Sequence, residues 1–113
     1  MSVAALATAL VVTFSAPTHT PAADAKWFYS VKATVAGKPV RATITSEIVD
    51  PFGSVHPVEY DGTHKNIVNR PFTGVFRDYV TWPAEALGFK LTFRVTVRAA
   101  GRMKVVTWWI SAR

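Results

Sequence analysis

The segment from Leu91 to Arg98 constrains the fold of this chain most strongly, because apolar and polar side chains alternate along it without exception. A period of two indicates a β-strand with one face in a core and the other in water. The apolar positions are Leu91, Phe93, Val95 and Val97, and the polar positions are Thr92, Arg94, Thr96 and Arg98. The chain is therefore predicted to contain a sheet whose outer face carries threonine and arginine.

The residues that follow form the second strand of a predicted hairpin. Apolar side chains occur at both odd and even positions of this strand, so its register has to be inferred from the length of the turn. A loop of two or four residues centred on Ala100 and Gly101 would place Trp108 inside and Trp109 outside. A three-residue loop that ends at Gly101 would reverse these two tryptophans. We favour the first register, which opposes three apolar pairs: Val95 with Val106, Phe93 with Trp108, and Leu91 with Ile110.

Composition bounds the class of protein. The chain has 113 residues, enough for one domain with its own core, and half of them are hydrophobic. Threonine, valine and aromatic residues are abundant, which favours strands over helices. The absence of cysteine excludes disulfide bonds and thiolate metal sites. A net charge of +6 favours either solubility alone or an affinity for anionic partners.

The rest of the chain reads as further short strands separated by turns. Alternating or apolar segments occur at 10–15, 27–35, 40–48, 55–60 and 75–82, and residues 66–74 are expected to be irregular or edge-like because Pro71 interrupts them. Pro83 and Gly88 bracket a predicted single helical turn. With the hairpin, these segments predict an all-β fold, an antiparallel two-sheet sandwich of about seven strands over residues 10–113.

Residues 1–9 are apolar and small, but no Lys or Arg precedes Lys26, and the run is too short to span a bilayer. We interpret them as a flexible N-terminal segment or a truncated export remnant, and we expect no transmembrane segment. The domain is expected to stay stable without them.

Several short motifs carry a resemblance to a known family. They are Ser-Ala-Pro-Thr at 15–18, Trp-Phe-Tyr-Ser-Val at 27–31, Ala-Gly-Lys-Pro-Val-Arg-Ala at 36–42 and Thr-Trp-Pro-Ala at 81–84. With the final hairpin, they resemble bacterial immunoglobulin-like or fibronectin type III-like domains, and more narrowly small secreted actinobacterial proteins of unassigned function. The resemblance implies an immunoglobulin-like sandwich in a secreted or cell-envelope setting. The cysteine pair of antibody domains is absent, and a shared sandwich does not carry a function with it.

Short signatures of catalysis, phosphate binding and dinucleotide binding are missing from the chain, so we expect a protein that is not an enzyme and needs no cofactor. His56, Glu59, Asp61 and His64 gather around one turn, yet their spacing matches no metal motif and favours a polar loop without a metal. Asp78 interrupts an apolar row in its strand. Three roles are open to it: an exposed edge residue, a hydrogen-bonded structural carboxylate and, least favoured of the three, a catalytic group.

The candidate binding face depends on the fold. In an immunoglobulin-like sandwich, the strands at 40–48, 91–98 and 103–110 would be neighbours in one sheet. Arginine and tryptophan are enriched at binding hot spots, although threonine and arginine are also ordinary choices for a solvated sheet face. The residues predicted to share this face include Arg41, Thr43, Arg94, Thr96, Arg98, Thr107 and Trp109.

These observations favour a noncatalytic secreted or cell-envelope interaction module. Its expected partner is a protein or an anionic cell-wall polymer or polysaccharide, with no specific nucleic acid. The alternative is a structural or assembly subunit that associates through its edge strands. A small hydrolase or metal enzyme ranks third.

Overall fold

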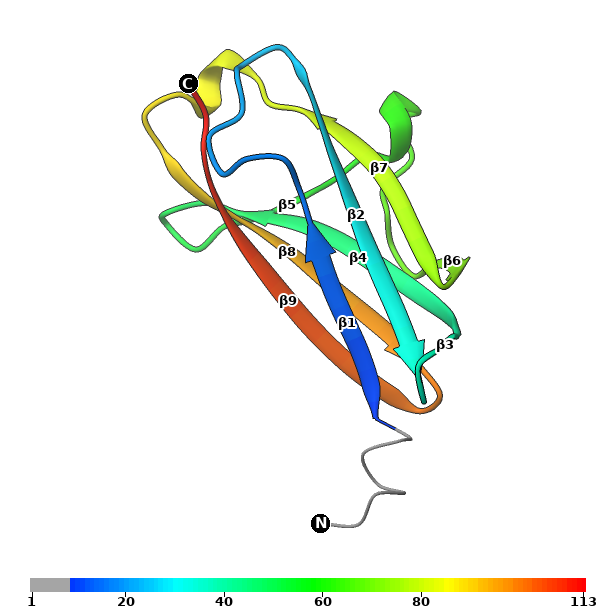
Figure 1. Ribbon diagram of the computed structural model, residues 1–113. Coiled ribbons are helices and arrows are strands. Elements are labelled where there is room, and N and C mark those ends of the chain that lie inside the picture. The colour runs from blue at the N-terminus through cyan, green and yellow to red at the C-terminus, as the bar shows by residue number, and fades with distance from the viewer. Residues whose placement is uncertain (1–8) are drawn as a thin grey trace.

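A computed structural model describes residues 9–113 and shows an all-β chain of nine strands and two 3-10 turns (Figure 1). The first strand begins at Leu10, as the sequence predicts, whereas the prediction for residues 1–9 lies outside the described residues except at Ala9. The elements are β1 (Leu10–Ser15), β2 (Lys26–Val35), β3 (Lys38–Pro39), β4 (Arg41–Val49), β5 (Val55–Pro57), η1 (Tyr60–Gly62), β6 (Arg70–Thr73), β7 (Val75–Thr81), η2 (Ala84–Ala86), β8 (Lys90–Ala99) and β9 (Arg102–Ser111).

The strands form two antiparallel sheets that pack face to face, which confirms the predicted sandwich (Figure 1). The first sheet has β2 at its centre, with β1 on one edge and β7 and the short β3 on the other. The second sheet has the order β4, β8, β9, and β5 and β6 pair with successive parts of the free edge of β4. The short strands β3 and β6 are the two beyond the seven that the sequence predicts.

The final hairpin has the register that we favoured. Phe93 lies opposite Trp108, and Val95 lies opposite Val106. The loop holds only Ala100 and Gly101, both with positive φ (52° and 71°), as in a two-residue turn whose twist suits a hairpin. The three-residue loop is therefore excluded, and Trp108 is on the inner side of β9.

Aromatic rings from both sheets meet around Phe93, which is fully buried. Its ring centroid lies 4.8 Å from that of Tyr29, 5.5 Å from that of Trp27 and 5.7 Å from that of Phe14. Those three side chains come from β1 and β2 of the opposite sheet. The alternating apolar positions of β2 and β8 therefore form one continuous core between the sheets.

The segment at 55–60 differs from its prediction as a strand. Only Val55–Pro57 pairs with β4, and the chain then enters η1, where Asp61 has a positive φ of 47°. Val58 and Ile67 are both buried and are joined by a backbone hydrogen bond of 2.8 Å from Ile67 N to Val58 O. The loop after β5 thus tucks two apolar side chains into the core, which a continuous edge strand would not do.

The connection between β1 and β2 covers part of an edge of the second sheet. Ser111 N donates to His19 O (2.8 Å), and Arg113 N donates to Pro21 O (2.9 Å). Ala23 N in turn donates to Arg113 O (2.8 Å). Residues 19–23 therefore run alongside the end of β9 in the same direction and satisfy its backbone groups there.

The central position of Phe93 predicts a large effect on stability. Phe93→Ala should lower the free energy of unfolding by ~3–5 kcal/mol, because it removes a fully buried ring and leaves a cavity between the sheets. Urea denaturation of the parent and the variant measures this difference. Val105→Ala, on the exposed side of the neighbouring strand, is the matched control and should change stability far less; equal losses would contradict the assignment of Phe93 to the core.

Candidate functional site

The predicted face is assembled on the outer side of β4, β8 and β9. The strand register aligns Glu47, Arg94 and Thr107 in one row and Thr45, Thr96 and Val105 in the next. A third row holds Thr43, Arg98 and Met103. Arg41 lies at the start of β4, beyond this last row, and Trp109 lies beside Thr92 at the opposite end of the face. The predicted residues therefore share one face, which we call the β4–β8–β9 face.

The arginines of this face are not equivalent. Arg94 donates from Nη2 and Nε to Glu47 Oε1, at 3.1 and 3.3 Å, so its charge is neutralised across the strand pair. Arg98 donates from Nη1 to the neutral Asn69 Oδ1 at 3.2 Å and keeps its full charge. Arg41 is exposed and has no ion pair within residues 9–113. The net positive charge of the face therefore resides at the Arg41 and Arg98 end.

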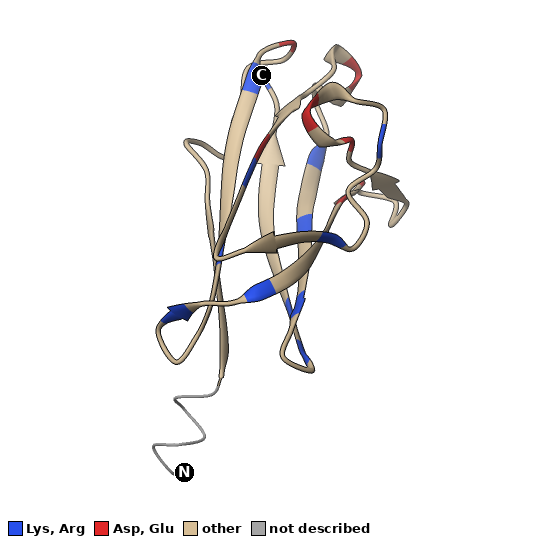
Figure 2. Cartoon of the chain, turned by 90° about the vertical axis from the view of Figure 1, so that its right-hand side faces the viewer, with Lys and Arg blue, Asp and Glu red and all other residues tan. Residues whose placement is uncertain are grey.

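These two arginines belong to a larger basic end of the sandwich (Figure 2). Register places it around the turns that follow β2 and β8, and no acidic residue accompanies its cations there. The first carboxylate along β4 is that of Glu47, about 20 Å from Arg41 at the usual rise per residue, a distance well beyond the screening length of ~8 Å at physiological salt. The residues of the basic end are Lys32, Lys38, Arg41, Arg98, Arg102 and Lys104.

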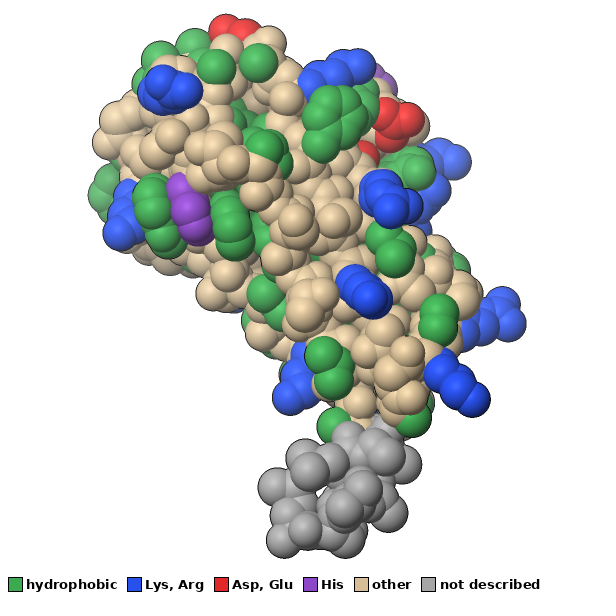
Figure 3. All heavy atoms as spheres, in the orientation of Figure 1, with side chains coloured by type: hydrophobic (Ala, Val, Ile, Leu, Met, Phe, Trp, Pro, Cys, Tyr) green, Lys and Arg blue, Asp and Glu red, His purple; other side chains and the backbone are tan. Residues whose placement is uncertain are grey.

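Trp109 faces outward, as predicted, with 44% of its surface exposed. Its ring is nevertheless stacked on the His19 imidazole, with 4.1 Å between centroids and 10° between planes. The same imidazole stacks on Trp108 at 3.8 Å, and His19 Nδ1 lies 2.7 Å from Trp109 O. Figure 3 shows a histidine flanked by hydrophobic side chains at this edge. Trp109 is thus part of an edge cluster, with one ring face covered.

No sequence pattern indicates this cluster, because His19 and Trp109 are 90 residues apart and belong to no motif. The Lys90 ammonium also lies 5.5 Å from the Trp109 ring centroid, within cation–π range. Because His19 covers one face of its ring and Lys90 lies close to it, Trp109 does not present an open aromatic surface on which a ligand could stack.

The polar turn that the sequence singled out does not form a metal centre. His56 Nε2 contacts Asp50 Oδ2 at 2.8 Å, whereas His64 Nδ1 contacts Glu59 Oε2 at 3.3 Å, so the histidines belong to separate pairs. Within the described residues, no three His, Asp or Glu side chains gather closely enough to hold a metal ion.

Asp50 has a local structural role instead. Its Oδ1 accepts hydrogen bonds from Phe52 N (2.9 Å) and Ser54 N (3.0 Å), which fixes the turn between β4 and β5. The hydrogen bond from His56 holds the pKa of Asp50 below its ordinary value, and the two backbone donors act in the same direction. Asp50 is therefore occupied by the turn.

Asp78 is a structural carboxylate and not an exposed edge residue. It is only 6% exposed, and its Oδ1 accepts a hydrogen bond of 2.9 Å from Asp61 N, which ties η1 to β7. Burial raises the pKa of Asp78 above its ordinary value. Nearby in the core, Tyr29 Oη and Ser46 Oγ lie 3.1 Å apart and link the two sheets.

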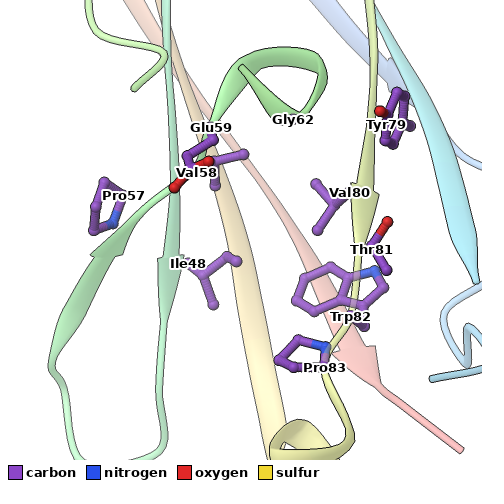
Figure 4. A pocket seen from close by; sticks show the side chains of 10 residues that line it. All are labelled: Ile48, Pro57, Val58, Glu59, Gly62, Tyr79, Val80, Thr81, Trp82 and Pro83. Atoms are coloured by element: carbon purple, nitrogen blue, oxygen red, sulfur yellow. The ribbon is translucent and has the colours of Figure 1, made fainter. Parts of the chain in front are cut away.

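A hollow of about 430 Å³ opens between β7 and the β4–β5 edge (Figure 4). Its lining is mostly apolar and includes Ile48, Val58, Val80 and Trp82. Glu59 supplies the one carboxylate of the lining, and its partner is the exposed His64. Tyr79 is the other ionisable residue of the lining.

The comparisons with known proteins bear on the fold alone. The chain is similar to the crystal structure of a DUF4466 family protein from Parabacteroides merdae ATCC 43184, with a TM-score of 0.50 and 15% sequence identity. The match covers 92% of this chain and 44% of that protein, so this chain spans less than half of its length. No family model and no curated protein matches the chain.

Helices that could cross a bilayer are absent from residues 9–113, where the only helical segments are the two short 3-10 turns.

The buried carboxyl of Asp78 predicts a pH-dependent stability. Because its pKa is higher in the folded than in the unfolded chain, the folded state holds the proton more tightly, and this contribution to stability is lost as the pH rises through the folded pKa. Asp78→Asn keeps an acceptor for Asp61 N–H but cannot ionise. The variant should therefore lose less stability than the parent between about pH 4 and pH 7.

Urea denaturation at a series of pH values measures this difference. Asp78→Ala is the control that removes the acceptor and should be destabilised at every pH. If Asp78→Asn followed the parent curve in parallel across the whole range, titration of this carboxyl would not contribute to stability.

Proposed function

We propose that the chain is a noncatalytic interaction module of the immunoglobulin-like or fibronectin type III-like type, secreted or held in the cell envelope. Its strand neighbours support this proposal, because β4, β8 and β9 correspond in order to strands C, F and G of such sandwiches, and β1, β2 and β7 correspond to A, B and E. The motifs quoted from the sequence support the extracytoplasmic setting.

The observation that carries the function is the unpaired charge at one end of the β4–β8–β9 face. Arg41 and Arg98 keep their charges, and the rest of the basic end adds to the same field. Guanidinium groups bind carboxylates and phosphates through two parallel hydrogen bonds. The partner is therefore an anionic cell-wall polymer, polysaccharide or protein surface.

The same face also offers contact area that does not depend on salt. Met103 and Val105 are 55% and 49% exposed and lie beside Arg98 and Thr96 in the strand register. Apolar contact contributes to affinity at every ionic strength, whereas the arginine contribution weakens as salt rises. Binding should thus combine a salt-sensitive end with a salt-insensitive strip along β9.

Association through edge strands remains the second candidate. Along β9, residues 19–23 occupy the backbone groups near Ser111 and Arg113. The part from Arg102 to Trp108 pairs only with β8 among the described residues, and Arg102 and Lys104 there discourage pairing between identical edges. This geometry gives the binding module the stronger support.

The test is a pair of double variants compared by retention on an immobilised acidic polysaccharide over a salt gradient. Arg41→Ser with Arg98→Ser should elute at clearly lower salt than the parent, because these charges are exposed and unpaired. Lys65→Ser with Arg113→Ser removes the same charge from exposed positions outside both sheet faces and should shift elution much less. If both double variants lowered the eluting salt concentration equally, retention would depend only on net charge, and the proposal would be overturned.

A further inference from the structure

The outer face of the other sheet carries a second basic surface, separate from the β4–β8–β9 face. The strand register brings together the outward side chains of β1, β2 and β7, and Figure 3 views the molecule in the orientation in which these strands lie in front. The basic residues of this face are Lys26, Lys32 and Arg77, and none of its outward side chains along the three strands is acidic. Along these three strands the face therefore carries positive charges and no negative charge.

One row of this face crosses all three strands at a single level. Ser15 lies opposite Ser30, and Ser30 lies opposite Arg77, so two hydroxyls and one guanidinium are aligned side by side. The Arg77 side chain is exposed and forms no ion pair within residues 9–113. Its donors are free to meet a ligand.

A shallow hollow of about 340 Å³ lies over this row. Ser15, Ser30 and Arg77 line it, together with Phe28 from the next level of the sheet and the Ala16–Pro17 turn. A space of this size accommodates one or two sugar rings, and its open shape suits a segment of a longer chain.

Phe28 supplies an aromatic wall. It is 59% exposed, and its ring contacts the Tyr79 ring at 5.7 Å between centroids. The Lys26 ammonium lies 4.6 Å from the Tyr79 centroid and thereby adds positive charge beside the pair. Phe28 and Arg77 line the same hollow, so an apolar ring and an unpaired guanidinium are both available to one ligand there.

We propose that this hollow binds a uronic acid residue of an acidic saccharide. Arg77 pairs with the sugar carboxylate, the apolar face of the pyranose lies against Phe28, and the hydroxyls of Ser15 and Ser30 exchange hydrogen bonds with ring hydroxyls. Each group of the ligand thus meets a complementary group of the protein: the carboxylate a guanidinium, the pyranose face an aromatic ring, and the sugar hydroxyls serine hydroxyls. The site is independent of the β4–β8–β9 face, because the two lie on opposite outer surfaces of the sandwich.

The chemistry of the hollow favours a saccharide over a nucleic acid. A phosphate backbone is bound by several cations in a track, whereas only Arg77 among the basic residues lines this hollow. Two serine hydroxyls are suited to an array of sugar hydroxyls. An acidic peptide would offer the carboxylate but no pyranose face for Phe28.

The experiment is a calorimetric titration of the full chain with an oligogalacturonate of six residues at physiological salt. We expect measurable binding, with clearly weaker binding of a neutral hexasaccharide of the same length and of a short polyglutamate. Equal binding of polyglutamate would overturn the saccharide part of the proposal, and equal binding of a single-stranded oligonucleotide would assign the surface to polyanions in general. Absence of binding to every probe would overturn the site.

Two charge variants separate the site from the net charge of the chain. Arg77→Gln should weaken oligogalacturonate binding by about tenfold or more, the loss expected for one charge-assisted pair. Lys65→Gln removes one positive charge from an exposed position outside both the hollow and the basic end, and should weaken binding by less than about twofold under salt screening. If both variants lost affinity equally, the hollow would have no specific role.

Phe28→Leu tests the aromatic wall, because it keeps an apolar side chain and removes the ring. It should weaken binding of oligogalacturonate while leaving the melting temperature near that of the parent, since Phe28 is exposed. Unchanged affinity would remove Phe28 from the site. The Arg41 and Arg98 double variant of the opposite face should bind oligogalacturonate in this hollow as the parent does, so the two proposals can fail separately.

Discussion

The contact of Phe93 with rings from the opposite sheet is the interaction on which the sandwich depends. Phe93 belongs to β8, in the middle of one sheet, and meets Tyr29 and Trp27 from the middle of the other. A two-sheet fold without disulfides has to be held together by such inter-sheet packing. Because these positions alternate strictly with outward ones, the same strands that build the core also present two outer faces to solvent.

The strands and the hairpin register could be predicted because their signals are local. Alternation along 91–98 and the short Ala100–Gly101 turn together decide which side chains face the core. The short β6 could not be found in this way, because Pro71 breaks its pattern and its pairing with β4 depends on a distant strand. The loop that buries Val58 and Ile67 was missed for the same reason.

For the candidate site, the sequence predicted which residues share a face, but not which of them are ion-paired or stacked. Arg94 and Glu47 are 47 residues apart, and only their cross-strand contact shows that one arginine is neutralised. The stack of His19 on Trp109 likewise requires that the β1–β2 connection wraps around the β9 edge. Alternation along β2 is consistent with an outward Phe28, but only the strand register brings Phe28 near Arg77 in the proposed saccharide hollow. Alternation in the sequence therefore predicts which side chains share a face of the sheet. Contacts between distant residues decide which charges and aromatic rings on that face are free to bind a partner.

The gathering of six cations at one end also affects how the molecule approaches its surroundings. Charges separated in this way give the sandwich an electric dipole along its long axis, in addition to its net charge of +6. An anionic surface would exert a torque on this dipole before any contact forms, turning the two hairpin loops toward it. Long-range orientation of this kind raises the rate of association more than the lifetime of the complex. The asymmetry would therefore act mainly on the first step of an encounter, and salt would slow that step.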